Sequence, residues 1–227
     1  MKMDEKLTPP SERIEKIVKE IQKRTAQEAY ALTIQPERKP TLFDSKFGGL
    51  PYWDFSKPYP TDSEGEKMLL LAQINFDEAK VDAPLPQKGM LQFFIAKNDM
   101  FGLDFDAPDK QNTFRVIYHE TIDQAVTVEQ VKDLGIPEGI SDEESMDTPV
   151  EKEAAVSVTK KTAYINPDCC DFGAVMREAI GQVCGQDTED WYDFLTAEES
   201  DTLYDELSVG GHWMLGYPYF TLSDPRE

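Results

Sequence analysis

Runs of apolar residues along the chain predict several β-strands. Residues 68–76 are apolar almost without interruption, which is typical of a strand buried on both faces. Residues 113–120 are β-branched and aromatic, and residues 89–95 are apolar with two adjacent phenylalanines, so both are predicted strands. Shorter apolar patterns predict further strands at residues 30–35, 101–105, 154–164 and 213–222.

The first predicted helix covers residues 11–27. Ile14, Ile17, Val18 and Ile21 form one apolar stripe, and the opposite face is charged. A helix of this kind packs by one side only. We therefore expect either a peripheral element or a contact between two copies of the chain.

Capping residues predict three more helices. Thr127 with Gln130 and Thr196 with Glu199 have the spacing of capping boxes, which open a helix ending before residue 135 and a helix reaching about residue 207. Asp171 is expected to cap a helix that ends near residue 185. Strands interrupted by a few helices, without regular alternation, indicate an α+β fold with a mostly antiparallel sheet and peripheral helices. Residues 137–149 are predicted to be a mobile acidic loop.

Two stretches combine a glycine pair with prolines and aromatic rings. In residues 45–60, Gly48 and Gly49 precede Tyr52 and Trp53, and residues 210–220 repeat the arrangement on a smaller scale. We expect these rings to be anchored in the core and the fold to be built around them. The likeness also allows two pseudo-repeated halves. The predicted organisation is an N-terminal helix at residues 1–28 followed by one α+β domain at residues 29–227.

Composition indicates a globular, acidic chain. The net charge is −21, and 40% of the residues are hydrophobic, which argues against disorder. The charge opposes binding to nucleic acids and to anionic membranes. The acidic stretches at residues 138–153 and 187–206 are either a solvated surface that maintains solubility or a patch that steers a cationic partner.

Cysteine usage and hydropathy predict the cellular location of the protein. Cys169, Cys170 and Cys184 are an odd number without CxxC spacing, and the N-terminus has no charged and then apolar leader. No run approaches the ~18 apolar residues that a transmembrane helix needs. We expect a soluble cytoplasmic protein with reduced thiols, in which Cys169 and Cys170 serve as small buried apolar residues.

Few residues suggest a catalytic or metal-binding role. Asp104 and Asp106 flank one residue of a predicted strand, so they could share a face and divide acid and base roles. His119 and His212 are the only histidines, which excludes a metalloprotease motif. His119, His212 and a cysteine could still meet in space as a tetrahedral metal site. A local hydrogen bond is the more common role, so no metal or cofactor is expected.

Gln73 interrupts the most apolar predicted strand. A buried amide must find hydrogen-bond partners, so Gln73 either ties down a neighbouring loop or presents its amide in a cleft. Signatures of phosphate loops, dinucleotide sites and serine hydrolases are absent from the sequence.

Several ordered motifs resemble the bacterial YwqG family across roughly residues 40–226. They are SKFGGLP at 45–51, LLLAQIN at 69–75, GMLQFF at 89–94, RVIY at 115–118 and HWMLGYP at 212–218. The resemblance implies a cytoplasmic bacterial α+β protein. Because the family is a domain of unknown function, it supplies no catalytic residues. Some members are encoded near secreted-toxin loci, which implies an immunity or regulatory role.

Three functional hypotheses follow. The first is a non-enzymatic interaction module that binds a basic protein through its acidic surface or aromatic loops. The alternative is a small-ligand-binding protein or enzyme with a cleft near the glycine-aromatic loops. The third is a structural role through homodimerisation by the N-terminal helix, so both a monomer and a homodimer are allowed. The predicted binding residues are Gly48, Gly49, Tyr52, Trp53, Gln73, Asp104, His212, Trp213 and Tyr217.

Overall fold

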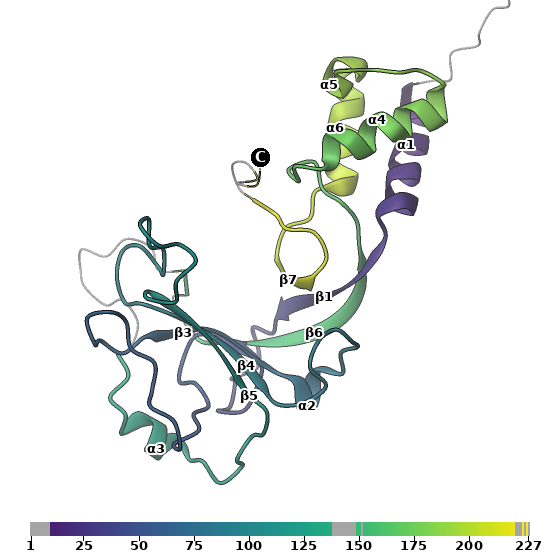
Figure 1. Ribbon diagram of the computed structural model, residues 1–227. Helices are drawn as coiled ribbons and strands as arrows, with labels where there is room; N and C mark the ends of the chain where they lie inside the picture. The colour runs from purple at the N-terminus through teal and green to yellow at the C-terminus, as the bar shows by residue number, and fades with distance from the viewer. Residues whose placement is uncertain (1–9, 138–148, 151, 221–223, 225, 227) are drawn as a thin grey trace, which may run out of the picture. The chain divides into compact units, whose positions relative to one another are not determined.

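The computed structural model of the chain describes residues 10–137, 149–150, 152–220, 224 and 226 (Figure 1). The helices are α1 (Pro10–Thr25), α2 (Phe76–Ala79), α3 (Val128–Lys132), α4 (Phe172–Cys184), α5 (Trp191–Phe194) and α6 (Ala197–Leu207). The strands are β1 (Gln27–Ile34), β2 (Lys46–Phe47), β3 (Leu69–Asn75), β4 (Met90–Ile95), β5 (Phe114–His119), β6 (Ala154–Ala163) and β7 (His212–Leu215).

The strands form one seven-stranded sheet in the order β5-β4-β3-β2-β6-β1-β7. Strand β3 is antiparallel to both β4 and β2, and β4 is antiparallel to β5. The two-residue strand β2 also pairs antiparallel with β6, so it joins strands that are far apart in the sequence. The predicted α+β class with an antiparallel sheet is confirmed.

The chain divides into two compact units. Unit 1 comprises residues 1–31 and 160–227, and unit 2 comprises residues 32–159. Strands β1 and β6 each have residues in both units. The predicted boundary between residues 28 and 29 stays a prediction.

Unit 1 is built around α1, α4 and α6. The apolar stripe of α1 is buried, as the 3.6-residue spacing predicts, and α1 packs against both other helices (Figure 1). The buried core of this unit consists of Ile14, Ile17, Val18, Ile21, Ile165, Cys169, Phe172, Met176, Ala179, Ile180, Leu203 and Leu207. The α1 stripe is therefore occupied within the chain, which removes the observation that suggested a dimer contact on this helix.

One charged pair ties α1 to α6. Glu199 is 1% exposed, and its carboxylate accepts hydrogen bonds from Nε (2.8 Å) and Nη2 of Arg13. Burial by itself raises the pKa of Glu199, but the Arg13 guanidinium and the hydrogen bonds of Thr196 together outweigh it and hold the pKa below its usual value. The same guanidinium lies over the Phe194 ring at 4.8 Å, so one cation connects α1, α5 and α6.

Most predicted elements are confirmed to within a few residues, including the capping boxes of α3 and α6. The predicted strand at residues 101–105 is wrong, because this segment is a loop whose turns are closed by hydrogen bonds to side chains and to nearby backbone. Asp171 does not cap α4 with its side chain. Its backbone is already helical (φ −81°, ψ −7°), whereas a capping side chain needs an extended backbone.

Strand β7 is shorter than the predicted strand at residues 213–222. It ends at Leu215, and the positive φ angles of Leu215 (62°) and Gly216 (81°) turn the chain out of the sheet. The predicted acidic loop at residues 137–149 lies almost wholly outside the described residues. The pseudo-repeat between residues 45–60 and 210–220 stays a prediction.

The glycine pair after β2 is required by its surroundings. Gly48 and Gly49 have φ angles of 61° and 71°. A Cβ atom on Gly48 would lie 2.5 Å from Cγ1 of Val150, and one on Gly49 would lie 2.5 Å from Oε2 of Glu153. Both positions therefore need the backbone freedom and the small volume of glycine.

Replacing Gly48 by alanine is expected to lower the free energy of unfolding by about 3 kcal/mol, because steric overlap adds to the left-handed backbone. The matched control is Gly65→Ala, where φ is also positive (89°) but no atom lies within 4 Å of the added Cβ. Its expected loss is about 1 kcal/mol. Urea unfolding of both variants provides the measurement, and equal losses would contradict the packing argument.

Candidate functional site

Two buried glutamines form the centre of unit 2. Gln73 on β3 lies directly opposite Gln92 on β4, and neither side chain is exposed. Nε2 of Gln73 donates to the carbonyls of Leu42 (3.0 Å) and Asp44 (2.9 Å). Its Oε1 accepts from the Tyr52 N–H (2.9 Å) and from Gln92 Nε2 (2.8 Å), and Gln92 Nε2 also donates to the Tyr52 carbonyl (2.7 Å). The two amides thus bind the backbone of residue 52 as a neighbouring strand would.

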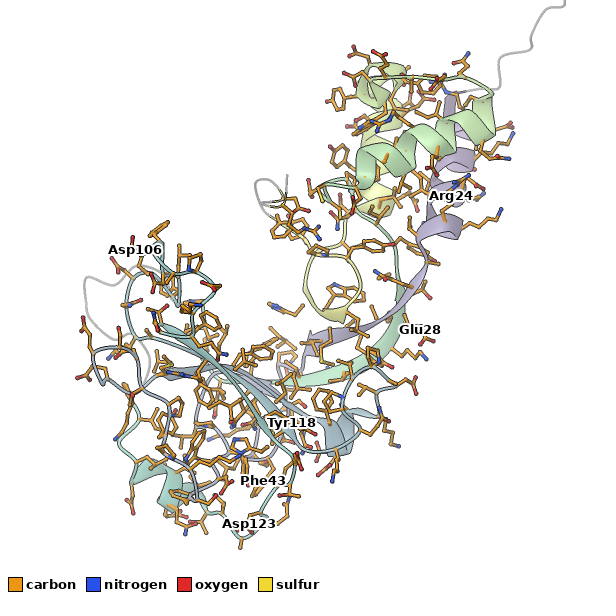
Figure 2. The ribbon with its side chains drawn as sticks, viewed as in Figure 1. Arg24, Glu28, Phe43, Asp106, Tyr118 and Asp123 are labelled. Carbon is orange, nitrogen blue, oxygen red and sulfur yellow. The ribbon has the colours of Figure 1, made fainter. Side chains whose placement is uncertain are left out.

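The glycine-aromatic segment is held onto the sheet by this amide network. Tyr52 and Trp53 are each 1% exposed, so the expectation that the rings of residues 45–60 are anchored in the core is confirmed for these two, whereas it is wrong for Phe55, which is 45% exposed. The Tyr52 hydroxyl accepts from the Asp123 N–H (2.9 Å), and its ring contacts Phe43 with 5.9 Å between the ring centroids. Figure 2 labels the two partner residues, Phe43 and Asp123. Trp53 Nε1 donates to the Lys57 carbonyl (3.1 Å). The polar atoms of both side chains are therefore used in hydrogen bonds that stabilise the fold.

His119, at the end of β5, extends the network. Its Nε2 lies 3.0 Å from Gln92 Oε1. Because Gln92 uses its amide nitrogen as a donor elsewhere, the oxygen must accept, which places the imidazole hydrogen on Nε2. Nδ1 then carries no hydrogen and can only accept a hydrogen bond. This buried atom has no hydrogen-bond partner among the described residues. The rings of Tyr52 and Trp53 meet the imidazole edge-on at 5.3 Å each.

The electrostatics of His119 follow from this enclosure. Burial is the main cause that lowers its pKa, the nearby Lys57 also lowers it and Asp54 partly opposes both, which together give a pKa of about 4. The imidazole is therefore neutral near pH 7. A neutral imidazole suits the network, because a proton on Nδ1 would be a buried charge without an acceptor.

Lys46 is a second buried ionisable group, opposite Gln73 in the β2–β3 register. It is 1% exposed, and Nζ donates to the carbonyls of Thr41 (3.0 Å) and Leu50 (2.5 Å). Burial lowers its pKa, the charges of Glu153 and Asp44 partly oppose this, and the result is a pKa of about 8. Lys46 therefore ties together the chain segments on either side of β2.

Part of this cluster is predictable from the sequence. Gln73 ties down the loops at residues 42–44 and 52, so the first of its two predicted roles is confirmed. Lys46, Gln92 and His119 were not grouped with it. Gln92 could have been found by the same signal, since it too is an amide within an apolar strand. Lys46 and His119 are brought beside the two glutamines only by the register of the sheet.

Asp104 does not form the predicted carboxylate pair. Its Oδ1 accepts from the backbone N–H groups of Asp106 and Ala107 (3.0 Å each), and its Oδ2 accepts from Asn112 (3.3 Å). These hydrogen bonds lower its pKa. Asp104 therefore closes a turn, and the expected strand face shared with Asp106 is wrong because the segment is a loop.

The remaining predicted residues, His212, Trp213 and Tyr217, belong to unit 1. Trp213 Nε1 donates to the Gly210 carbonyl, and the Tyr217 hydroxyl donates to the Thr25 carbonyl, both at 3.0 Å. Trp213 and Tyr217 line a hollow whose enclosed space is about 10 Å³, the room that a single water molecule needs. Its other lining residues are Ala163, Tyr164, Asn166, Val209, Leu215 and Gly216.

Unit 1 also carries a strongly charged surface on α5, on α6 and on the segment before them, which we call the acidic helix face. Its exposed carboxylates are Asp187, Glu189, Asp190, Asp193, Glu198, Asp201, Asp205 and Glu206. Within the described part of the chain, none of them forms an ion pair with Lys or Arg. No Lys or Arg occurs between residues 178 and 225.

Two exposed tyrosines lie on this face. Tyr192 is 59% exposed and Tyr204 is 37% exposed. Burial of part of its ring is the main cause that raises the pKa of Tyr204, and the charges of Asp168 and Tyr192 raise it further. The exposed cations of α1 pair with glutamates of α1 itself and with Glu178. The acidic helix face is therefore uncompensated and carries two aromatic side chains.

Most of this architecture matches a known protein family. A family model described as "Domain of unknown function (DUF1963)" matches residues 45–227. The chain belongs to the DUF1963 family. The matched DUF1963 range includes β2 to β7 with the amide network and the acidic helix face, and it excludes α1 and β1. No curated protein matches the chain.

None of the helices in the described residues is both long enough and apolar enough to span a bilayer.

Truncating Gln73 tests the role of the amide network. Gln73→Ala leaves the Tyr52 N–H and the carbonyls of Leu42 and Asp44 without their partner, so we expect a loss of about 3 kcal/mol in the free energy of unfolding. The matched control is Gln87→Ala, which removes an exposed amide with one local hydrogen bond and is expected to cost less than about 0.5 kcal/mol. Similar losses in the two variants, measured by urea unfolding, would contradict the proposed role.

His119 is expected to make stability depend on pH. Its folded pKa of about 4 lies below the unfolded value of about 6.5, so the unfolded chain binds the extra proton between these values. The contribution of His119 to the free energy of unfolding is therefore lost as pH falls from 6.5 to 4, by about 3 kcal/mol in total. Urea unfolding at half-unit pH steps should show a shallower fall for His119→Gln than for the parent chain. His212→Gln, which replaces the other histidine, is measured in parallel, and identical slopes for the parent and His119→Gln would rule the assignment out.

Proposed function

We propose that this DUF1963 protein is a non-enzymatic interaction module that binds a cationic protein partner through the acidic helix face. The observation that carries the proposal is a set of eight exposed carboxylates around Tyr192 and Tyr204 that form no ion pair with any Lys or Arg of the described residues. Carboxylates of this kind attract a positively charged surface and speed its approach. Tyrosine side chains supply contact area at a small entropy cost and are frequent binding hot spots.

Two further observations support binding rather than catalysis. The polar atoms of the amide network are used to hold loops, as Gln73 and Lys46 illustrate. The hollow beside Trp213 has room for about one water molecule. The net charge of −21 also favours a basic protein over nucleic acid as the partner.

The family subgroup and the cellular location of the protein belong to the same proposal. The sequence motifs support assignment to the YwqG group and, through it, an immunity or regulatory role in a bacterial cell. A cytoplasmic location is supported by Cys169, Cys170 and Cys184, which are all free thiols.

The test is affinity capture from a lysate of the source cells with three baits at low and at moderate salt. One bait is the parent chain. The second neutralises the face with Asp193→Asn, Glu198→Gln, Asp201→Asn and Asp205→Asn, and it is expected to lose a basic protein that the parent retains. The third combines Tyr192→Ser with Tyr204→Ser, keeps the charge, and is expected to lose the same protein because contact area is removed. Quantitative mass spectrometry provides the measurement.

The matched control neutralises four exposed carboxylates of unit 2, namely Glu37, Glu64, Glu66 and Asp133, to the corresponding amides. This variant has the same net charge as the neutralised face variant and should retain the partner. Equal loss from both would show that only total charge matters. Retention of no basic protein by the parent chain would refute the proposal.

A further inference from the structure

The outer strand of unit 2 presents free main-chain groups. Strand β5 is at one end of the sheet order, and its register with β4 runs from Ile95 opposite Phe114 to Met90 opposite His119. The Ala96 N–H donates to the Thr113 carbonyl (2.7 Å), which makes this a hydrogen-bonded pair. Because such pairs alternate in an antiparallel ladder, Phe114, Val116 and Tyr118 direct their N–H and C=O groups away from β4. Nothing in the described part of the chain pairs with this side of β5 as a strand.

One of these outward groups is already bound, but by a side chain. The Val116 N–H donates to Oε1 of Gln111 at 2.8 Å. The carboxamide oxygen of this residue stands where the backbone carbonyl of an added strand would stand. Gln111 is exposed, so a stronger competitor can displace it without disturbing the core.

Exposed apolar side chains lie on β5 and on the loop beside its start. Among the described residues of unit 2, five of the eight large hydrophobic residues with high exposure lie between residues 100 and 118. They are Met100 (43%), Leu103 (46%), Phe105 (77%), Val116 (39%) and Tyr118 (37%). Tyr118 lies on β5, and Asp106 marks the loop that precedes this strand (Figure 2). An apolar concentration of this kind is typical of an interaction site.

The loop that presents three of these side chains is well braced. Thr113 Oγ1 donates to the Gly102 carbonyl (2.7 Å), and Asp104 closes the following turn. A Cβ atom on Gly102 would lie 3.1 Å from Ile95, so the loop packs closely against β4. A braced loop loses little conformational entropy when a partner binds.

Charges at the two ends of β5 identify the kind of occupant. Exposed carboxylates lie near its start (Asp99, Asp106, Asp109) and after its end (Glu120, Asp123), and they outnumber the exposed lysines beside them. Lys97 and Lys110 offset part of the first group, with Lys110 pairing to Asp109 at 3.0 Å, and Lys88, whose carbonyl accepts from the Tyr118 hydroxyl, offsets part of the second. A second copy of the chain, pairing antiparallel, would bring the acidic start of one strand beside the acidic end of the other. Like charges therefore disfavour a second copy, and a strand with cationic ends fits.

We infer that the β5 edge is a docking site for an extended segment of another protein, which adds to the sheet as an eighth strand. The segment is apolar at the alternate positions facing Val116 and Tyr118 and carries Lys or Arg at both ends. Main-chain hydrogen bonds to residues 114, 116 and 118 supply affinity, and the apolar and acidic contacts supply selectivity. Gln111 occupies the edge until the segment binds. This site is separate from the acidic helix face and does not depend on the function proposed for it.

The experiment selects random eight-residue peptides, displayed on phage, against the purified full-length chain. The most enriched peptide is then synthesised, and its Kd is measured by calorimetry. We expect alternating apolar residues with cationic ends. Val116→Pro should weaken the binding at least tenfold, because proline removes the outward N–H while an edge strand tolerates it. Gln111→Ala should strengthen the binding several-fold, because the peptide no longer displaces a side chain.

The two variants act in opposite directions, so misfolding cannot mimic the expected pattern. Tyr192→Ser with Tyr204→Ser is the control from the acidic helix face and should leave the Kd of the peptide unchanged. The inference is overturned if the selection yields no such peptides, if Val116→Pro binds the peptide as the parent does, or if Gln111→Ala weakens it. A dimer of the parent chain that Val116→Pro dissociates, seen by light scattering, would assign the edge to a second copy instead.

Discussion

The structure of unit 2 depends on one requirement, which is that a buried amide must be hydrogen-bonded. Gln73 and Gln92 meet across β3 and β4, and their carboxamides bind both backbone groups of Tyr52. This contact draws the glycine-aromatic segment onto the sheet and buries Trp53 beside it. The tight turn through Gly48 and Gly49 leads the chain from β2 into that segment.

The buried amide and charged groups of Gln73, Gln92, Lys46 and Glu199 are all hydrogen-bonded, and the exception among the described residues is Nδ1 of the neutral His119. Many of the carboxylates lie on the surface. Glu199 is buried only because Arg13 compensates its charge, and Lys46 is buried against backbone carbonyls. With 44 acidic and 23 basic residues, many surface carboxylates necessarily lack a counter-charge. The acidic helix face results from this imbalance. Repulsion among its carboxylates costs stability, and a cationic partner relieves that repulsion.

The two candidate docking surfaces share a physical design. Each places exposed rings or aliphatic side chains on a braced element and surrounds them with negative charge. On the acidic helix face, the capping bonds of Asp190 and Thr196 fix the starts of α5 and α6. At the β5 edge, hydrogen bonds of Asp104 and Thr113 fix the preceding loop. Preorganisation of this kind leaves more of the contact energy available for binding.

The sequence by itself determined the features that depend on neighbours along the chain. The stripe of α1, the capping boxes at Thr127 and Thr196, and the apolar strands follow from periodicity and local hydrogen bonds. Only the tertiary structure decided which strands pair, where the outer edge lies, and that Lys46, Gln92 and His119 join Gln73. Residues 101–105 were misassigned because an alternating pattern cannot reveal the turns that Asp104 closes. Gln73 and Tyr52 are 21 residues apart, and partners at that distance are chosen by packing and register, which a local pattern does not encode.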